Sequence, residues 1–532
     1  MSKKDSVKQN QPFIVHRGEI VEASYNDPMV SAYRDNLFEE ALPPILSTDD
    51  SARHMKYYPP YDKDKRDQPS HLRYHEIQNS LRLFSVLSKH LDLEQRVSRV
   101  IRGGYVNRQP LSPEFRRKLN KSAEFLSSNE NARRRIGTMN TGFTILGISG
   151  VGKSRTMLEV LTLYPQVIIH KHYKGRDFNF IQIVWLKLDC PPDGSIRGLC
   201  LNFFQTLDAI LKTNYHHNYR GCTANELRLH MARIAAEFGI GILVIDEIQN
   251  LSVAASGGRA EMLNFFVNLN NALGVPVVLI GTYKAYDILT GEFRQIRRGT
   301  GQGDFIWDPM TEDGEDGDWE FFVKDLWKYQ YTQKPVELTP DLSHTLYYES
   351  QGITDIAAKL YMISQIRAIA NRTEIITAKL IQRVAKEDFR SATKVLSALK
   401  TGNTEALFQI EDVKPINIED FIEEVKRNDS SAELLRDTGQ LEDSKVEPKQ
   451  EQKGPVDEQK NSTQVHLCQS ITEKKKSKRF TGSNVEKEGL VSTKIEAEKL
   501  NVAPYDALSK AGFIQSATEY LPQEKQDDSS LP

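Results

Sequence analysis

The sequence predicts an α/β fold with a mostly parallel β-sheet, followed by a small domain made of helices. From about residue 130 onward, short apolar runs typical of strands alternate with helical runs, the pattern of a parallel sheet. A glycine-rich G-x-x-x-x-G-K-S loop separates one such strand from the next helix. From about 320 to 400 only helical runs remain. We therefore predict an N-terminal extension at 1–125, an α/β core at 126–310 and a helical lid at 311–405.

The composition excludes several classes of protein. The 532 residues carry 70 Lys and Arg against 72 Asp and Glu, which excludes a uniformly basic nucleic-acid coat but not a local basic patch. No apolar run approaches the ~20 residues that span a bilayer, and the N-terminus lacks a hydrophobic signal region. The four cysteines form no C-x-x-C pair. We expect a cytoplasmic protein with no membrane contact.

The extension contains one strongly periodic run, residues 75–92. It places Ile77, Leu81, Phe84 and Leu87 at helical steps of three and four. We predict a single amphipathic helix that packs on the core of its own chain.

The first candidate binding element of the core is the loop at 147–154, which lies between the strand-like run 143–146 and the helical run 156–163. Its glycines let the backbone curl so that successive N–H groups face phosphate oxygens, and the helix N-terminus adds partial positive charge. Lys153 suits the β- and γ-phosphates of ATP, and Ser154 suits Mg²⁺. The candidate nucleotide-binding residues are Gly147, Ser149, Gly150, Val151, Gly152, Lys153 and Ser154.

A second buried strand, 241–245, leads directly into Asp246 and Glu247. A carboxylate in this place suits the Mg²⁺ shell, so Asp246 joins Ser154 as a candidate metal residue. Glu247 suits the positioning and polarising of the attacking water.

A further strand-like run, 181–189, and two helical runs separate these motifs. This order, with a glutamate after the aspartate, indicates the additional-strand class of ATPases rather than a nucleotide kinase. The next strand, 275–282, ends at Thr282, which resembles the sensor-1 position of AAA+ ATPases beside the γ-phosphate. Arg297 and Arg298 follow, and either is a candidate arginine finger for a neighbour's γ-phosphate or a surface ion-pair residue. A finger requires an oligomer.

Three other segments also carry predictions. In the lid, Asp355 stands where AAA+ proteins commonly have a sensor-2 arginine, so that sensor is expected to be absent. Residues 170–176 predict a basic hairpin tip, at which Lys171, Lys174 and Arg176 either contact DNA phosphates or are simply solvated. The stretch 406–502 is predicted to be a mostly disordered linker. Apolar residues return at 503–532, which is typical of a segment that docks on a partner or packs on its own chain.

Beyond these motifs, the chain resembles the TnsC family, the AAA+ regulators of Tns-type transposons, over about residues 28–400. The segments that carry the resemblance are 32–36, 40–44, 101–106, 164–168, 200–204, 243–249, 262–267, 297–299 and 305–309. The tail after about 410 is divergent.

The resemblance implies a regulator that binds ATP and Mg²⁺ and assembles into rings or filaments on duplex DNA with little sequence preference. Such proteins connect a target-site selector, contacted through the N-terminal region, to transposase subunits, contacted through the C-terminal tail. They are bacterial and associate with the nucleoid when active. Lys153, Ser154, Asp246 and Glu247 keep the nucleotide roles given above.

Two other functions remain open. One is an ATP-driven remodeller or helicase loader, although no aromatic-glycine pore loop is evident. The other is a switch that binds ATP and barely hydrolyses it; Glu247 argues against this function, whereas Asp355 in place of the sensor-2 arginine leaves it open. Slow, regulatory ATP hydrolysis is the leading expectation.

Overall fold

The computed structural model describes residues 16–106, 108–112, 142–253, 262–266, 274–286, 304–312, 317–403 and 407. All of them lie in the first of two compact units, which extends to Asp443. None of the helices in these ranges is long and apolar enough to cross a membrane.

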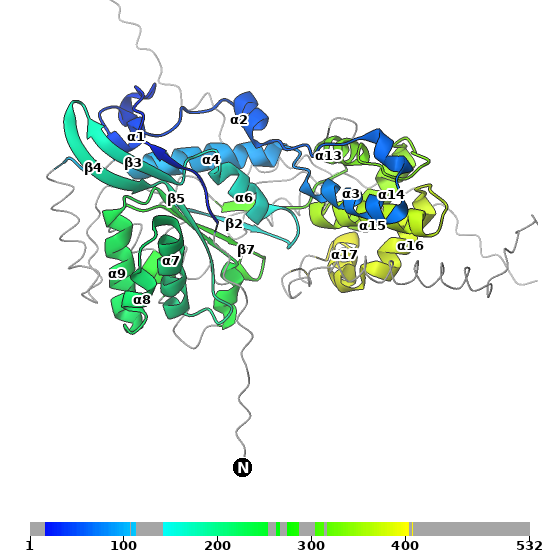
Figure 1. The fold of residues 1–532 in the computed structure, drawn as a ribbon. Coiled ribbons are helices and arrows are strands. Elements are labelled where there is room, and N and C mark those ends of the chain that lie inside the picture. The colour runs from blue at the N-terminus through cyan, green and yellow to red at the C-terminus, as the bar shows by residue number, and fades with distance from the viewer. Residues whose placement is uncertain are drawn as a thin grey trace, which may run out of the picture. The chain divides into compact units, whose positions relative to one another are not determined.

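The core is built on a five-stranded sheet with the strand order β5-β6-β7-β2-β8 (Figure 1). Every neighbouring pair runs parallel, which confirms the predicted parallel α/β fold. The register places Asp189 beside Asp246 and Leu146 beside Gly281, so the carboxyl ends of these strands meet at one edge. The strands are β2 (Phe143–Gly147), β5 (Trp185–Asp189), β6 (Ile242–Asp246), β7 (Val277–Gly281) and β8 (Asp304–Trp307).

Both faces of this sheet are covered, which explains why its strands are continuous apolar runs. In β6, Ile242 and Val244 belong to the hydrophobic cluster that α4 and α6 share, whereas Leu243 and Ile245 belong to the cluster of α7 and α9. Figure 1 shows α7, α8 and α9 side by side on one face. The helices are α4 (Ser88–Tyr105), α6 (Lys153–Leu161), α7 (Ile196–Leu211), α8 (Tyr215–Tyr219) and α9 (Ala224–Glu237).

A second sheet of three strands has the order β1-β3-β4 and consists of β1 (Ile20–Glu22), β3 (Val167–Tyr173) and β4 (Arg176–Ile183). Strands β3 and β4 form the predicted hairpin, and Lys174 and Gly175 at its tip both have positive φ, as a two-residue hairpin turn of type I′ requires. The prediction of one strand over 181–189 was wrong. The chain leaves β4 after Ile183 and enters β5 in the other sheet.

The prediction of one helix over 75–92 was also wrong. The run is divided among α3 (Ser70–Gln78), a 3₁₀ turn η3 (Asn79–Arg82) and the first turns of α4. Between them, the backbone of Phe84 pairs with that of Tyr57 through hydrogen bonds of 2.8 and 3.1 Å, which requires an extended chain. Ile77, Phe84 and Leu87 are buried as predicted and Leu81 is partly buried, but these residues belong to separate elements.

The remaining short elements before α4 are η1 (Ser31–Tyr33), α1 (Leu37–Glu40), α2 (Thr48–Met55) and η2 (Lys63–Asp67). Hydrogen bonds connect this N-terminal part of the chain, including α4 and the residues after it, to the core. The side chain of Asn36 donates to the Tyr105 carbonyl at 2.7 Å, and the Tyr105 hydroxyl donates to the Gly239 carbonyl at 2.9 Å. The buried Arg108 guanidinium donates to the Ile240 carbonyl at 2.6 Å. Helix α4 itself packs on α6, the helix that follows the glycine-rich loop.

The lid is helical, as expected, and α3 from the N-terminal part packs on its central helix, α15. The lid elements are α13 (Asp318–Trp327), α14 (Pro340–Ser350), α15 (Thr354–Ala370), α16 (Ala378–Asp388), η5 (Arg390–Ala392) and α17 (Thr393–Lys400). A bidentate ion pair joins Arg73 of α3 to Glu374, with both N···O distances at 2.8 Å and side chains only 4% and 11% exposed.

Replacing Glu374 with alanine is expected to lower the unfolding free energy by about 3–5 kcal/mol, because the buried Arg73 would lose its counter-ion. Urea denaturation measures the change. Glu387→Ala is the control, since its pair with Arg367 is far more exposed and is worth about 0–1 kcal/mol. Equal, small losses for both variants would contradict a structural role for the buried pair.

Candidate nucleotide-binding site

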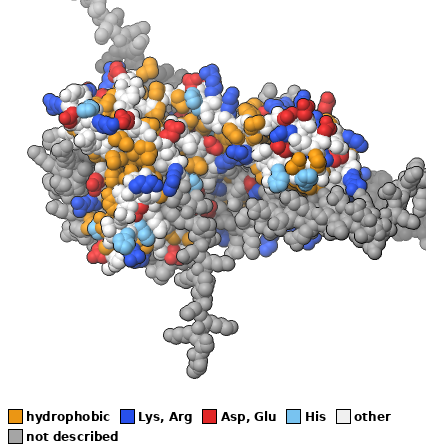
Figure 2. All heavy atoms as spheres, viewed as in Figure 1, with side chains coloured by type: hydrophobic (Ala, Val, Ile, Leu, Met, Phe, Trp, Pro, Cys, Tyr) orange, Lys and Arg blue, Asp and Glu red, His pale blue; other side chains and the backbone are white. Residues whose placement is uncertain are grey.

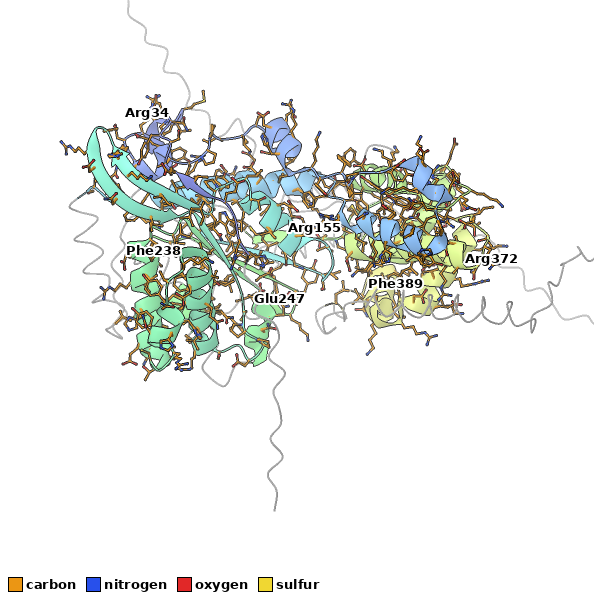
Figure 3. All side chains as sticks on the ribbon, viewed as in Figure 1. Arg34, Arg155, Phe238, Glu247, Arg372 and Phe389 are labelled. Atoms are coloured by element: carbon orange, nitrogen blue, oxygen red, sulfur yellow. The ribbon has the colours of Figure 1, made fainter. Side chains whose placement is uncertain are left out.

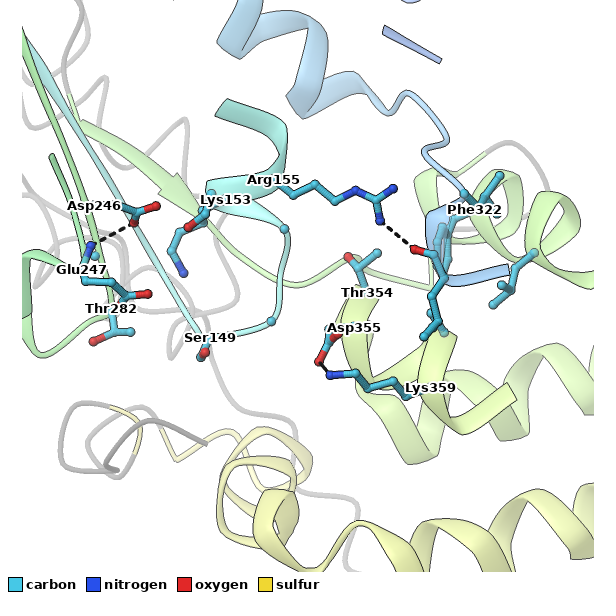
Figure 4. A pocket seen from close by; sticks show the side chains of 18 of the residues that line it. Ser149, Lys153, Arg155, Asp246, Glu247, Thr282, Phe322, Thr354, Asp355 and Lys359 are labelled. Atoms are coloured by element: carbon cyan, nitrogen blue, oxygen red, sulfur yellow. Dashed lines mark hydrogen bonds and ion pairs between the residues drawn. The ribbon is translucent and has the colours of Figure 1, made fainter. Parts of the chain in front are cut away.

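A cavity of about 320 Å³ opens at the carboxyl ends of β2, β6 and β7, bounded on one side by the core and on the other by the lid (Figure 4). In open parallel sheets, ligands bind at this edge. The core lines it with Ser149, Gly150, Gly152, Lys153, Ser154, Arg155, Asp246, Glu247, Gln249, Gly281 and Thr282. The lid and the N-terminal part add Phe322, Leu326, Thr354, Asp355, Ala358, Lys359, Ser80, Leu81 and Leu83. Figure 3 shows Glu247 and Arg155 on the side of the core that faces the lid.

The glycine-rich loop follows β2 and leads into α6, as its spacing predicts. Gly150 and Gly152 have φ of +87° and +95°, a backbone conformation that glycine adopts without strain. A Cβ at Gly147 would lie 2.1 Å from the carbonyl oxygen of Trp307 in β8, so this glycine permits close strand packing. The Trp307 indole N–H also donates to the Val151 carbonyl at 3.0 Å. Gly147 and Val151 therefore contact Trp307 of β8 on the side of the loop away from the cavity, whereas Ser149, Gly150 and Gly152 line the cavity.

Lys153, the first residue of α6, is buried and lines the cavity. Its ammonium donates to the Gly147 and Ile148 carbonyls at 2.9 and 2.8 Å, so it is folded over the loop. Ser154 lines the same cavity one residue later. The loop thus offers a cation and a hydroxyl beside a helix N-terminus, an arrangement suited to a polyphosphate chain.

Asp246, at the end of β6, has a partner that the sequence analysis missed. The ammonium of Lys187 in β5 lies 2.8 Å from Asp246 Oδ2 and 2.9 Å from Asp189 Oδ1, and its side chain is only 4% exposed. Burial alone lowers the pKa of Lys187, but the two carboxylates outweigh burial and raise it, so Lys187 is a cation. The other oxygen of Asp246 accepts the Glu247 N–H at 2.9 Å. The lone lysine in an apolar strand was the signal that could have revealed this pair.

Glu247 has φ of +56°, a left-handed conformation that is uncommon for residues other than glycine. The side-chain amide of Gln249 donates to the Glu247 carboxylate, and its carbonyl oxygen accepts the Thr282 N–H at 3.1 Å. The Thr282 hydroxyl is buried and has no hydrogen-bond partner in the described structure. Gln249, which the sequence analysis did not single out, therefore joins the predicted water-positioning residue to the predicted sensor.

The N-terminal part supplies one wall of the cavity through Ser80, Leu81 and Leu83. Arg155 of α6 fixes this wall, because its guanidinium donates to the Leu81 and Arg82 carbonyls at 3.0 and 2.7 Å. Sequence reasoning missed this contribution, since about 70 residues separate the wall from the loop.

On the lid side, Asp355 lines the cavity, and its carboxylate lies 2.7 Å from the ammonium of Lys359 one turn later in α15. The sequence analysis identified Asp355 as the residue in place of an arginine. It missed Lys359, which brings a cation to the same cavity from the next helical turn.

The basic hairpin is separate from the cavity, and two of its three predicted cations are paired with carboxylates. Lys171 contacts Glu22, and Lys174 contacts Asp35 at 2.8 Å, a hydrogen bond that raises the pKa of Lys174. Arg176 makes no ion pair within the described ranges. On the face shown in Figure 2, Lys and Arg side chains are interspersed with acidic ones.

Other predicted residues lie outside the described ranges: Arg297, Arg298, and the segments 406–502 and 503–532 apart from residue 407. Among the described residues, no group of three or more His, Cys, Asp or Glu side chains forms a metal site. The oxygen donors Ser154 and Asp246 in the cavity fit Mg²⁺, which takes one or two protein ligands together with phosphate oxygens and water.

The parallel sheet, the glycine-rich loop and the helical lid together form an α/β fold of the AAA+ type. Residues 140–289 match the family model described as AAA domain. No curated protein matches the chain.

Several solved structures resemble part of the chain, at low identity. The Walker-type ATPase of Pyrococcus abyssi is 16% identical over 56% of this chain and 75% of its own, with a TM-score of 0.31. Cdc6p from Pyrobaculum aerophilum is 14% identical over 62% and 86%, with a TM-score of 0.34. The Drosophila ORC bound to DNA is 11% identical over 66% and 72%, with a TM-score of 0.33.

Proposed function

We propose that this protein is an ATP-dependent regulator of transposition that assembles on duplex DNA and connects a target-site selector to the transposase. The observation that carries the ATP-dependent part is the cavity in which the glycine-rich loop, Lys153, Asp246, Glu247 and Thr282 converge. The transposition part rests on the sequence resemblance to TnsC.

In this proposal, backbone N–H groups of the loop and Lys153 bind the β- and γ-phosphates of ATP. Ser154 and Asp246 hold Mg²⁺, which supplies charge neutralisation on the phosphates. Glu247 orients and polarises the attacking water, and Gln249 fixes the Glu247 carboxylate through its side-chain amide. The unpartnered hydroxyl of Thr282 is available to the γ-phosphate or to that water.

Hydrolysis is proposed to be slow and regulatory, so that the ATP-bound form licenses insertion and turnover resets it. Assembly of copies into a ring or filament follows from the proposed role of Arg297 or Arg298 as a finger that reaches a neighbour's γ-phosphate.

Contact with DNA is proposed to be independent of sequence and to be made through phosphates. Of the three hairpin cations, Arg176 needs no rearrangement to make such a contact, whereas Lys171 and Lys174 must first leave Glu22 and Asp35. The N-terminal extension is proposed to contact the selector, and 503–532 the transposase. We place the active protein in the bacterial cytoplasm, on the nucleoid.

The experiment that tests this function measures binding to duplex DNA with ATP, ADP or a non-hydrolysable ATP analogue, together with particle mass. We expect multimers on DNA with ATP and with the analogue, and none with ADP. DNA binding that ignores the nucleotide would overturn the proposed switch. Fast turnover that continues without DNA would instead favour a remodeller or helicase loader.

A further inference from the structure

Among the described lid residues, Lys359 is the cation that lines the cavity, and it is held by a neighbouring carboxylate. Figure 4 shows Asp355 and Lys359 on the lid side, opposite Lys153 and Asp246. The ammonium of Lys359 lies 2.7 Å from Asp355 Oδ2, and both side chains line the cavity.

This part of the lid is in direct contact with the glycine-rich loop. The Asp355 N–H donates to the Gly150 carbonyl at 3.0 Å. A Cβ added at Gly150 would lie 3.2 Å from the Ile353 side chain and 3.3 Å from Asp355 Cβ. The first turn of α15 therefore lies against the loop backbone, and its charges act on whatever the loop binds.

The two members of the pair differ in exposure. The Lys359 side chain is 14% exposed, whereas that of Asp355 is 47% exposed. An Asp–Lys pair four residues apart on a free helix surface is worth little and needs no functional explanation. Here the lysine is largely removed from water within a cavity suited to phosphate, where a charge interacts more strongly.

The described cations on the core side, like Lys359 on the lid side, have partners within the protein. The Lys153 ammonium donates to two loop carbonyls, the Arg155 guanidinium donates to Leu81 and Arg82, and Lys187 neutralises Asp246. A triphosphate bound at the loop would face Lys359 as the lid's cation and Asp355 as the lid's anion, because both line the cavity.

We propose that the Asp355–Lys359 pair is a latch that responds to the triphosphate. The phosphate chain of ATP takes Lys359 from Asp355, so that Lys359 becomes the lid's phosphate-binding residue. The carboxylate of Asp355 competes with the phosphate for Lys359 and repels it, so only a phosphate chain long enough to reach Lys359 overcomes this opposition, which sets the preference for ATP over ADP. The inference rests on the proposed nucleotide-binding function of the same cavity.

The test measures equilibrium binding of β,γ-methylene ATP and of ADP to the full chain. Lys359→Ala is expected to weaken binding of the triphosphate analogue about tenfold or more and binding of ADP less than threefold, because the shorter phosphate chain does not reach Lys359. Asp355→Asn is expected to tighten binding of the analogue about fivefold, because a like charge is removed. A structural pair would give losses in both variants.

Lys400→Ala is the matched control, since Lys400 pairs with Glu349 in the lid at 2.8 Å with 25% exposure and does not line the cavity. Thermal melting of each variant separates folding defects from binding, and Lys359→Arg is expected to restore most of the binding. If Lys359→Ala matches Lys400→Ala, or weakens both nucleotides equally, the latch is wrong. If the wild type binds neither nucleotide, the proposed function itself fails.

Discussion

Replacing Glu247 with glutamine is expected to lower the rate of ATP hydrolysis about 10²- to 10⁴-fold, the usual contribution of a positioned general base. ATP binding is expected to stay within about threefold of the wild type, because the residues proposed to bind the phosphates are unchanged. Steady-state turnover and equilibrium binding of ATP measure the two effects separately.

The structure explains why this substitution tests chemistry rather than folding. Glutamine has the shape of glutamate, and its carbonyl oxygen can still accept the hydrogen bond that Gln249 donates. The left-handed backbone at this residue, with φ of +56°, is unaffected. The amide lacks the negative charge that polarises water.

The control is Glu237→Gln, which makes the same change at an exposed residue at the end of α9. It is expected to hydrolyse ATP at the wild-type rate. Normal turnover by Glu247→Gln would remove Glu247 from the mechanism, and with it the assignment of this strand end as the hydrolytic centre.

Replacing Lys153 with alanine is expected to weaken ATP binding at least about 30-fold, because the loss of one partner from a close charged contact typically costs about 2–5 kcal/mol. A ligand that binds only the folded state raises its stability, so ATP is expected to raise the melting temperature of the wild type and not of the variant. Thermal melting with and without ATP and Mg²⁺ measures both.

Without nucleotide, the two proteins are expected to melt at similar temperatures. The carbonyls of Gly147 and Ile148, which Lys153 contacts, belong to the loop at the cavity, where water can replace the ammonium. Lys379→Ala, at an exposed lid position, is the control and should keep the full response to ATP. An undiminished response of Lys153→Ala would show that ATP binds elsewhere.

The sequence alone predicted the parts of the candidate site that consist of residues adjacent in the chain. Residues 147–154 and 241–247 could be interpreted directly, because loop curvature, strand length and the residue types at a strand end are local properties. The hairpin around Lys174 and Gly175 and the parallel sheet were predictable for the same reason. Each depends on short-range spacing that the backbone geometry enforces.

Tertiary structure alone decided which distant residues complete the cavity. Lys187 reaches Asp246 across the β5–β6 pair, 59 positions away in the sequence, and Leu81 reaches the cavity through Arg155. The run at 75–92 has helical spacing, yet pairing of Phe84 with Tyr57 breaks it into separate elements. Lys359 faces the cavity because α15 lies against Gly150. These features depend on contacts between segments far apart in the chain, for which residue spacing carries no signal.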